Sequence, residues 1–139
     1  MNIHANSVVS PPSKAQPPSF SSLEFRNALG MFATGVTIVT ARTREGQVIG
    51  LTANSFNSVS LDPPLVLWSL SQAAASLPAF RAGSHYAINV LAADQKALAE
   101  RFALKGLDRW AGVSFTEGPC GAPLLFHGGR FYTEHAMGD

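Results

Sequence analysis

The sequence has little charge and almost no cysteine. Only 14% of its 139 residues are Asp, Glu, Lys or Arg, against about 25% in an ordinary soluble domain, so we expect a ligand or a second subunit to cover part of the surface. The single cysteine, Cys120, excludes an intrachain disulfide and a thiolate metal cluster. The basic residues are scattered and the net charge is +1, which argues against a nucleic-acid partner.

Several sequence patterns are also missing. No apolar run approaches the roughly 20 residues of a membrane span, and the first 20 residues lack an apolar signal core, so we expect a cytoplasmic protein without a membrane partner. The histidines do not show metal-site spacing, and no nucleophile elbow, P-loop or Gly-x-Gly-x-x-Gly pattern occurs. We therefore predict no metal and no catalytic side chain; if the protein is an enzyme, a cofactor carries the reaction.

What is present predicts one domain behind a tail. Pro, Ser and Ala dominate residues 1–20, which predicts a disordered segment, and residues 21–139 have the length of a single domain. Ser21 and Glu24 have the spacing of a capping box, so a helix is expected to begin there. Gly35 is expected to end that helix.

Short β-branched or apolar runs predict a series of strands, at residues 36–40, 47–53, 65–70, 86–91, 113–115 and 124–132. The run at 65–70 is a continuous one, which is typical of a strand buried on both faces, and the run at 86–91 is expected to be another buried strand. Helices are predicted at residues 76–82 and after a cap at Asp94, the second with an apolar stripe of Ala97, Leu98 and Phe102. Because short strands outnumber helices, we predict a mainly β protein, a small barrel with peripheral helices.

The most informative segment is residues 52–60 (TANSFNSVS). It places four hydroxyls and two amides in nine uncharged residues between apolar runs. Neutral donors and acceptors at a protected place suit a flat heteroaromatic ring with carbonyl and amide edges. The alternative is a solvated edge strand whose polar side chains face water, and composition leaves both open.

Four sequence blocks resemble the short-chain flavin reductases, the reductase components of two-component flavin-dependent monooxygenases. They are residues 25–40 (FRNALGMFATGVTIVT), 50–66 (GLTANSF followed by SVSLDPPLV), 88–103 and 108–113. The resemblance implies the family's fold, a mainly β split barrel that binds FMN and forms a homodimer. It also implies hydride transfer from NADH or NADPH to FMN or FAD, with reduced flavin passed to a separate monooxygenase.

The resemblance also implies the residues that would hold the flavin. The segment 52–60 would line the isoalloxazine ring and the ribityl chain, the turn before the first strand would lie close to the ring, and a helix start would reach the phosphate. These residues are Thr34, Gly35, Val36, Thr37, Thr52, Ala53, Asn54, Ser55, Ser58, Val59, Ser60 and Ser76.

The sequence departs from the family near residues 123–125. Residues 118–124 and 123–132 resemble two family blocks that a longer segment normally separates, and here the blocks run together. In the family that segment carries a Gly-Asp-His motif whose histidine lies beside the nicotinamide. We therefore expect a domain shortened around residues 123–125, and the alternative function is a flavin-binding module without reductase turnover.

Overall fold

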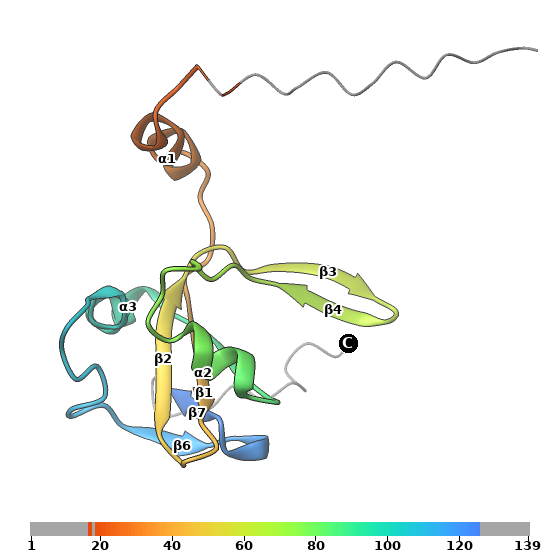
Figure 1. Cartoon of the computed structure of the whole chain (residues 1–139), viewed down its shortest axis with the longest axis vertical. Helices are drawn as coiled ribbons and strands as arrows, with labels where there is room; N and C mark the ends of the chain where they lie inside the picture. The colour runs from red at the N-terminus through yellow and green to blue at the C-terminus, as the bar shows by residue number, and fades with distance from the viewer. Residues whose placement is uncertain (1–16, 18, 126–139) are drawn as a thin grey trace, which may run out of the picture. The chain divides into compact units, whose positions relative to one another are not determined.

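The computed structural model of the chain describes residue 17 and residues 19–125. The chain divides into two compact units, Met1–Ala33 and Thr34–Asp139. Helix α1 belongs to the first unit, and the strands of the described residues belong to the second (Figure 1).

Helix α1 (Ser22–Gly30) begins at the predicted capping box. The Glu24 amide donates to the Ser21 hydroxyl at 3.2 Å, and the Ser21 amide donates to the Glu24 carboxylate at 2.8 Å. The Ser21 amide, and secondarily its hydroxyl, stabilise the ionised carboxylate and hold the pKa of Glu24 below its ordinary value. The predicted end at Gly35 is wrong: the helix ends at Gly30, where glycine costs about 1 kcal/mol of helix propensity relative to alanine.

A three-stranded antiparallel sheet forms the centre of the second unit. β1 (Thr37–Arg42) lies between β2 (Val48–Ala53) and β5 (Ala87–Val90). The hairpin predicted from β-branched residues is confirmed as β1–β2. The prediction that residues 86–91 form a buried strand is wrong, because three residues of β5 are only half-buried and Val90 is exposed.

β3 (Asn57–Leu61) and β4 (Pro64–Leu67) form a separate hairpin that extends away from this sheet (Figure 1). Every residue of β4 is exposed, so the prediction of a doubly buried strand at residues 65–70 is wrong. Among the described residues, no second layer covers the hairpin. Apolar side chains are buried only where another layer packs against them. The polar segment 52–60 supplies most of β3. Ser58 in this strand is exposed, as the alternative of a solvated edge strand predicts.

Helix α2 (Leu77–Ala82) confirms the helix predicted at residues 76–82. Trp68, which follows β4, packs edge-on against two rings near this helix. Its ring centroid lies 5.3 Å from that of Phe80 and 5.6 Å from that of Tyr86. The three rings therefore anchor the segment between β4 and α2.

Helix α3 (Lys96–Ala103) begins later than predicted. Asp94 lies inside a 3₁₀ turn, η1 (Ala93–Gln95), and Gln95 is the residue that precedes the helix. The assignment of Asp94 as the helix cap is therefore wrong. The turn is closed by the Gln95 amide, which donates to the Ala92 carbonyl at 3.0 Å, so one extra turn separates Asp94 from the start of α3.

The last described elements are β6 (Phe115–Glu117), the 3₁₀ turn η2 (Pro119–Gly121) and β7 (Pro123–Leu125). β6 and β7 pair antiparallel. Strands were predicted at residues 113–115 and 124–132, and both are present with shifted starts. The part of the second beyond residue 125 lies outside the described residues.

The core lies between the central sheet, α3 and β7. Ile38, Phe102 and Leu125 are buried, and Leu98 packs against them. Ala97, predicted to share the apolar stripe of α3, is exposed instead, because successive helical residues are turned by about 100° and Ala97 points away from the face that Leu98 and Phe102 turn to the core.

The chain is mainly β with peripheral helices, as predicted. Over residues 19–125 its strands form one three-stranded and two two-stranded sheets and do not close into a single barrel. No helix among the described residues is long and apolar enough to cross a membrane.

Candidate functional site

Two segments of the predicted flavin site meet at one end of the central sheet. Thr37, the first residue of β1, lies opposite Ala53, the last residue of β2. Antiparallel pairing thus brings the chain that enters β1 beside the chain that leaves β2. Thr37 and Ala53 are buried, whereas residues 34–36 on one side and Asn54 and Ser55 on the other are exposed. The structure therefore brings these predicted residues to the same end of the sheet, next to the buried pair Thr37 and Ala53.

Two threonine hydroxyls of the predicted site fix this end of the sheet. Thr37 Oγ1 donates to the Ala53 carbonyl at 2.8 Å. Thr52 Oγ1 donates to the Ala99 carbonyl in α3 at 2.5 Å. Each hydroxyl keeps lone pairs that can accept a further hydrogen bond, but its single proton is committed to main chain. These two residues hold the shape of the site, and ligand donors must come from elsewhere.

The remaining part of the segment 52–60 lies on the β3–β4 hairpin. Ser58 and Val59 are exposed, and Ser60 is half-buried. The Ser69 amide donates to Ser55 Oγ at 2.8 Å, which connects the base of this hairpin with the end of β2. The nine-residue segment is thus divided between two sheets that meet near Ser55.

Ser76 stands apart from these residues at the start of α2. It is half-buried, and its side chain makes no capping hydrogen bond. Helix α2 has six residues, so its end carries only a small part of a helix dipole. The chain between β4 and α2 leads to Ser76. The Ser55–Ser69 hydrogen bond attaches the start of this connecting chain to the residues that follow β2.

The sheet end suits an uncharged, planar ring. Its predicted contact residues contain no ionisable side chain, and the Asn54 amide and the exposed main chain supply neutral donors and acceptors. A Cβ placed at Gly35 would meet no heavy atom within 4 Å, so the space beside this glycine is open. Carbonyl and N–H groups along one edge of an isoalloxazine ring fit such a donor set.

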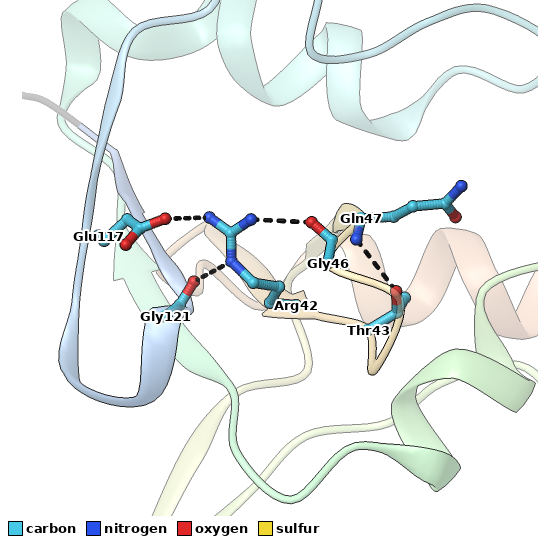
Figure 2. A network of polar contacts seen from close by, with 6 residues as sticks. All are labelled: Arg42, Thr43, Gly46, Gln47, Glu117 and Gly121. Atoms are coloured by element: carbon cyan, nitrogen blue, oxygen red, sulfur yellow. Dashed lines mark hydrogen bonds and ion pairs between the residues drawn. The ribbon is translucent and has the colours of Figure 1, made fainter.

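Sequence reasoning missed a polar network at the opposite end of β1 (Figure 2). Arg42 Nε donates to the Gly121 carbonyl at 3.0 Å, and Nη1 donates to the Gly46 carbonyl at 2.8 Å. Its Nη2 pairs with the Glu117 carboxylate at 2.5 Å. The guanidinium therefore joins the β1–β2 turn to the β6–β7 hairpin, a link that no local pattern could have indicated.

Asn89 is a second position that sequence reasoning missed. Its Nδ2 donates to the Ile38 carbonyl at 3.0 Å and to Thr40 Oγ1 at 3.2 Å, and its Oδ1 accepts from the Leu125 amide at 2.8 Å. An amide inside an apolar strand was the available signal. Asn89 thus connects β7 to the central sheet, although β7 does not pair with any strand of that sheet.

A cavity of about 430 Å³ lies beside α3. Its lining includes Arg101, Leu98 and Val113 but none of the predicted flavin residues. Across the described residues, no group of three His, Cys, Asp or Glu side chains could hold a metal ion.

The fold is that of solved flavin reductases. The NADH:FAD oxidoreductase SgcE6 of Streptomyces globisporus, solved with NAD and FAD fragments, has a TM-score of 0.69 and 39% identity to this chain. The match covers 74% of this chain and 62% of SgcE6. The flavin reductase PheA2 gives a TM-score of 0.66 at 43% identity, covering 76% of this chain and 67% of PheA2.

Sequence comparison identifies the family. The model of the flavin reductase like domain matches residues 29–134, and the chain belongs to this family, which confirms the resemblance drawn from its sequence blocks. The FMN reductase (NADH) SmoA of Agrobacterium fabrum is 58% identical over 90 residues, which is 65% of this chain and 51% of SmoA.

A second relative is a subunit of a two-component system. The reductase component of the flavin-dependent trigonelline monooxygenase of Acinetobacter baylyi is 43% identical over 102 residues, 73% of this chain and 33% of that protein. The chain thus spans between a third and about half of the length of these two relatives.

Proposed function

We propose that this chain is an NAD(P)H-dependent flavin reductase that transfers hydride from NADH or NADPH to FMN or FAD. Its reduced flavin would serve a separate monooxygenase component. The observation that carries the proposal is the meeting of residues 34–36 with Asn54 and Ser55 at one end of the sheet, inside the segment that matches the family. The names of the relatives, an FMN reductase (NADH) and a monooxygenase reductase component, support the same reaction.

When bound, the flavin supplies N5 as the hydride acceptor, and the protein supplies binding and orientation. In this proposal the main chain of Thr34 and Gly35, the Val36 amide and the Asn54 side chain hold one edge of the ring. The Val36 carbonyl already accepts from the Leu91 amide at 3.0 Å. Thr37 and Thr52 keep that main chain in place through their bonds to Ala53 and Ala99. Hydride transfer between two stacked rings needs alignment and exclusion of water, so no side chain has to act as an acid or a base.

The rest of the flavin would extend from the sheet end. Ser58, Val59 and Ser60 on β3 would follow the ribityl chain, and Ser76 would reach the phosphate. These residues lie on β3 and at the start of α2, two elements that follow β2 in the chain.

We also propose that the protein is a cytoplasmic homodimer and that residues 21–139 form a split barrel shortened around residues 123–125. The β3–β4 hairpin leaves a large part of its apolar side chains exposed, including Val59 at 57% and Leu67 at 56%. A second copy that covers this hairpin would remove the apolar area from water. The low charge of the chain supports such a covered face.

A flavin-binding module without turnover is the second candidate function. β7 begins at Pro123, where the family carries a further segment, and this junction is packed into the core: Pro123 is buried and its carbonyl accepts from Thr40. A compact junction leaves the nicotinamide side without the histidine of the Gly-Asp-His motif. This candidate retains the flavin site and loses only the hydride donor.

The test is NADH or NADPH consumption by the purified 139-residue protein, with and without added FMN or FAD, beside a titration of flavin fluorescence. We expect oxidation that depends on both protein and flavin. Flavin binding without oxidation would favour the binding module. Absence of flavin binding would overturn both functions.

A further inference from the structure

Ser55 lies at the point where the β3–β4 hairpin leaves the central sheet. It follows the end of β2 by two residues and precedes β3, and Ser69 follows β4. The Ser69 amide donates to Ser55 Oγ at 2.8 Å, and Ser55 Oγ makes a longer contact of 3.4 Å to the Ser69 carbonyl. One side chain therefore binds the amide of Ser69 and contacts its carbonyl.

This contact continues the hairpin beyond its ladder. The last paired residues of β3 and β4 are Asn57 and Leu67, and Ser55 and Ser69 stand two positions further towards the sheet. At this position the Ser55 hydroxyl takes the place of a main-chain ladder partner. The hairpin base is therefore closed by a side chain.

The hairpin depends on this closure. An isolated two-stranded hairpin is marginally stable in water, and β3 and β4 have no buried residue to hold them together. Their ladder is also interrupted by a register shift between Ser58 and Ser60. A fixed hairpin base is then what determines where these two serines lie relative to Asn54.

We propose that Ser55 is a positioning residue for the flavin and not a direct contact. Its hydroxyl holds Ser69, which fixes the base of the β3–β4 hairpin and so fixes Ser58 and Ser60 relative to the sheet end. This inference rests on the proposed flavin function. It assigns the Ser55 proton and lone pair to main chain, and it leaves the flavin to Asn54, the exposed main chain and β3.

The experiment compares Ser55→Ala, Ser55→Thr and the control Ser114→Ala in the 139-residue protein. Ser114 is exposed and lies outside the predicted site. Two quantities are measured for each variant: FMN affinity by fluorescence titration, and hydrogen exchange of the Ser69 amide without FMN. A hydrogen bond of this kind is worth about a factor of ten in an equilibrium.

We expect Ser55→Ala to speed exchange of the Ser69 amide and to weaken FMN affinity, each by about tenfold. Ser55→Thr keeps the hydroxyl, so both quantities should stay within about twofold of the parent protein, as in Ser114→Ala. Loss of FMN affinity with an unchanged Ser69 amide would overturn the positioning role in favour of direct contact. A freely exchanging Ser69 amide with full FMN affinity would overturn it as well.

The parent protein separates this inference from the function on which it rests. If the parent does not bind FMN, the flavin function fails and the positioning role fails with it. If the parent binds FMN and the variants depart from the expected pattern, only the role of Ser55 is overturned.

Discussion

The hydroxyl of Thr40 donates a 2.5 Å hydrogen bond to the carbonyl of Pro123, which lies 83 positions later in the chain. Both residues are buried. Asn89 Nδ2 donates to the same hydroxyl at 3.2 Å. Thr40 therefore joins the middle of the central sheet to β7, and its side chain satisfies two polar groups that are shielded from water.

Thr40→Val should destabilise the protein. Valine has the same shape but offers no hydroxyl, so the Pro123 carbonyl loses its short hydrogen bond and Asn89 loses an acceptor. We expect a loss of about 1–2 kcal/mol in the free energy of unfolding, measured by urea denaturation. Thr34→Val, at an exposed position, is the control and should change stability by less than about 0.5 kcal/mol. Equal stability of the two variants would contradict the prediction.

Gly50→Ala should overpack the core. A Cβ at Gly50 would lie 2.8 Å from Phe102 Cε1 and 3.1 Å from Trp110 Cζ2. Phe102 is fully buried, so its ring has little room to move. We expect a cost of about 1–3 kcal/mol and a changed near-ultraviolet circular dichroism spectrum. Gly35→Ala adds the same methyl group to open space and should leave stability unchanged; a similar cost there would refute steric overlap as the cause.

Arg42→Lys should cost more stability than Glu117→Gln. Lysine cannot reach the Gly121 and Gly46 carbonyls and the carboxylate together, because it lacks the planar fork of the guanidinium. The Glu117 side chain is 66% exposed, so its ion pair is worth about 1 kcal/mol or less. Urea denaturation of both variants at low and high salt gives the comparison. A larger loss for Glu117→Gln would show that the ion pair, and not the carbonyl contacts, carries the link.

The capping box of α1 should weaken in acid. The pKa of Glu24 is lowered in the folded helix, so its contribution is complete above the ordinary glutamate pKa and is lost as the pH falls through the lowered value. The Ser21 amide, which donates to this carboxylate, reports the change in its proton chemical shift. We expect a titration midpoint below the ordinary value, and no such transition in Glu24→Gln. A midpoint at or above the ordinary value would contradict the hydrogen-bonded carboxylate.

Charge on the β3–β4 hairpin should dissociate the proposed homodimer. Leu67 is 56% exposed, and Leu67→Glu would place a carboxylate where a second copy would cover the hairpin. Sedimentation should give twice the 14.7 kDa chain mass for the parent protein and the single mass for this variant. Ala97→Glu, on the exposed face of α3, should remain dimeric. A monomeric parent would contradict the proposal directly.

The features that could be predicted from sequence are local ones. The Ser21–Glu24 capping box, the β1–β2 hairpin and helix α2 depend on residues only a few positions apart, and their patterns indicated them correctly. The segment 52–60 was likewise identified as unusual from its composition alone. Its first residues lie at one end of the central sheet, whereas residues 57–60 belong to β3 in a separate hairpin.

The features that sequence could not predict depend on distant partners. The apolar residues of β4 were expected to be buried, but burial requires a covering layer that the strand itself does not encode. The 3₁₀ turn at Asp94 shifted helix α3 without a sequence signal. The contacts of Arg42 with Glu117 and of Asn89 with Leu125 join residues 75 and 36 positions apart, and no periodicity reveals such pairs.

The two tryptophans of this chain occupy distinct surroundings, which gives the protein two built-in optical reporters. Trp68 stacks edge-on with Phe80 and Tyr86 beside the hairpin base, whereas Trp110 contacts Phe102 in the core. Replacing Trp110 with phenylalanine would leave a single tryptophan, Trp68, one residue from Ser69. Its emission would then follow the opening and closing of the hairpin base in real time, without an attached dye.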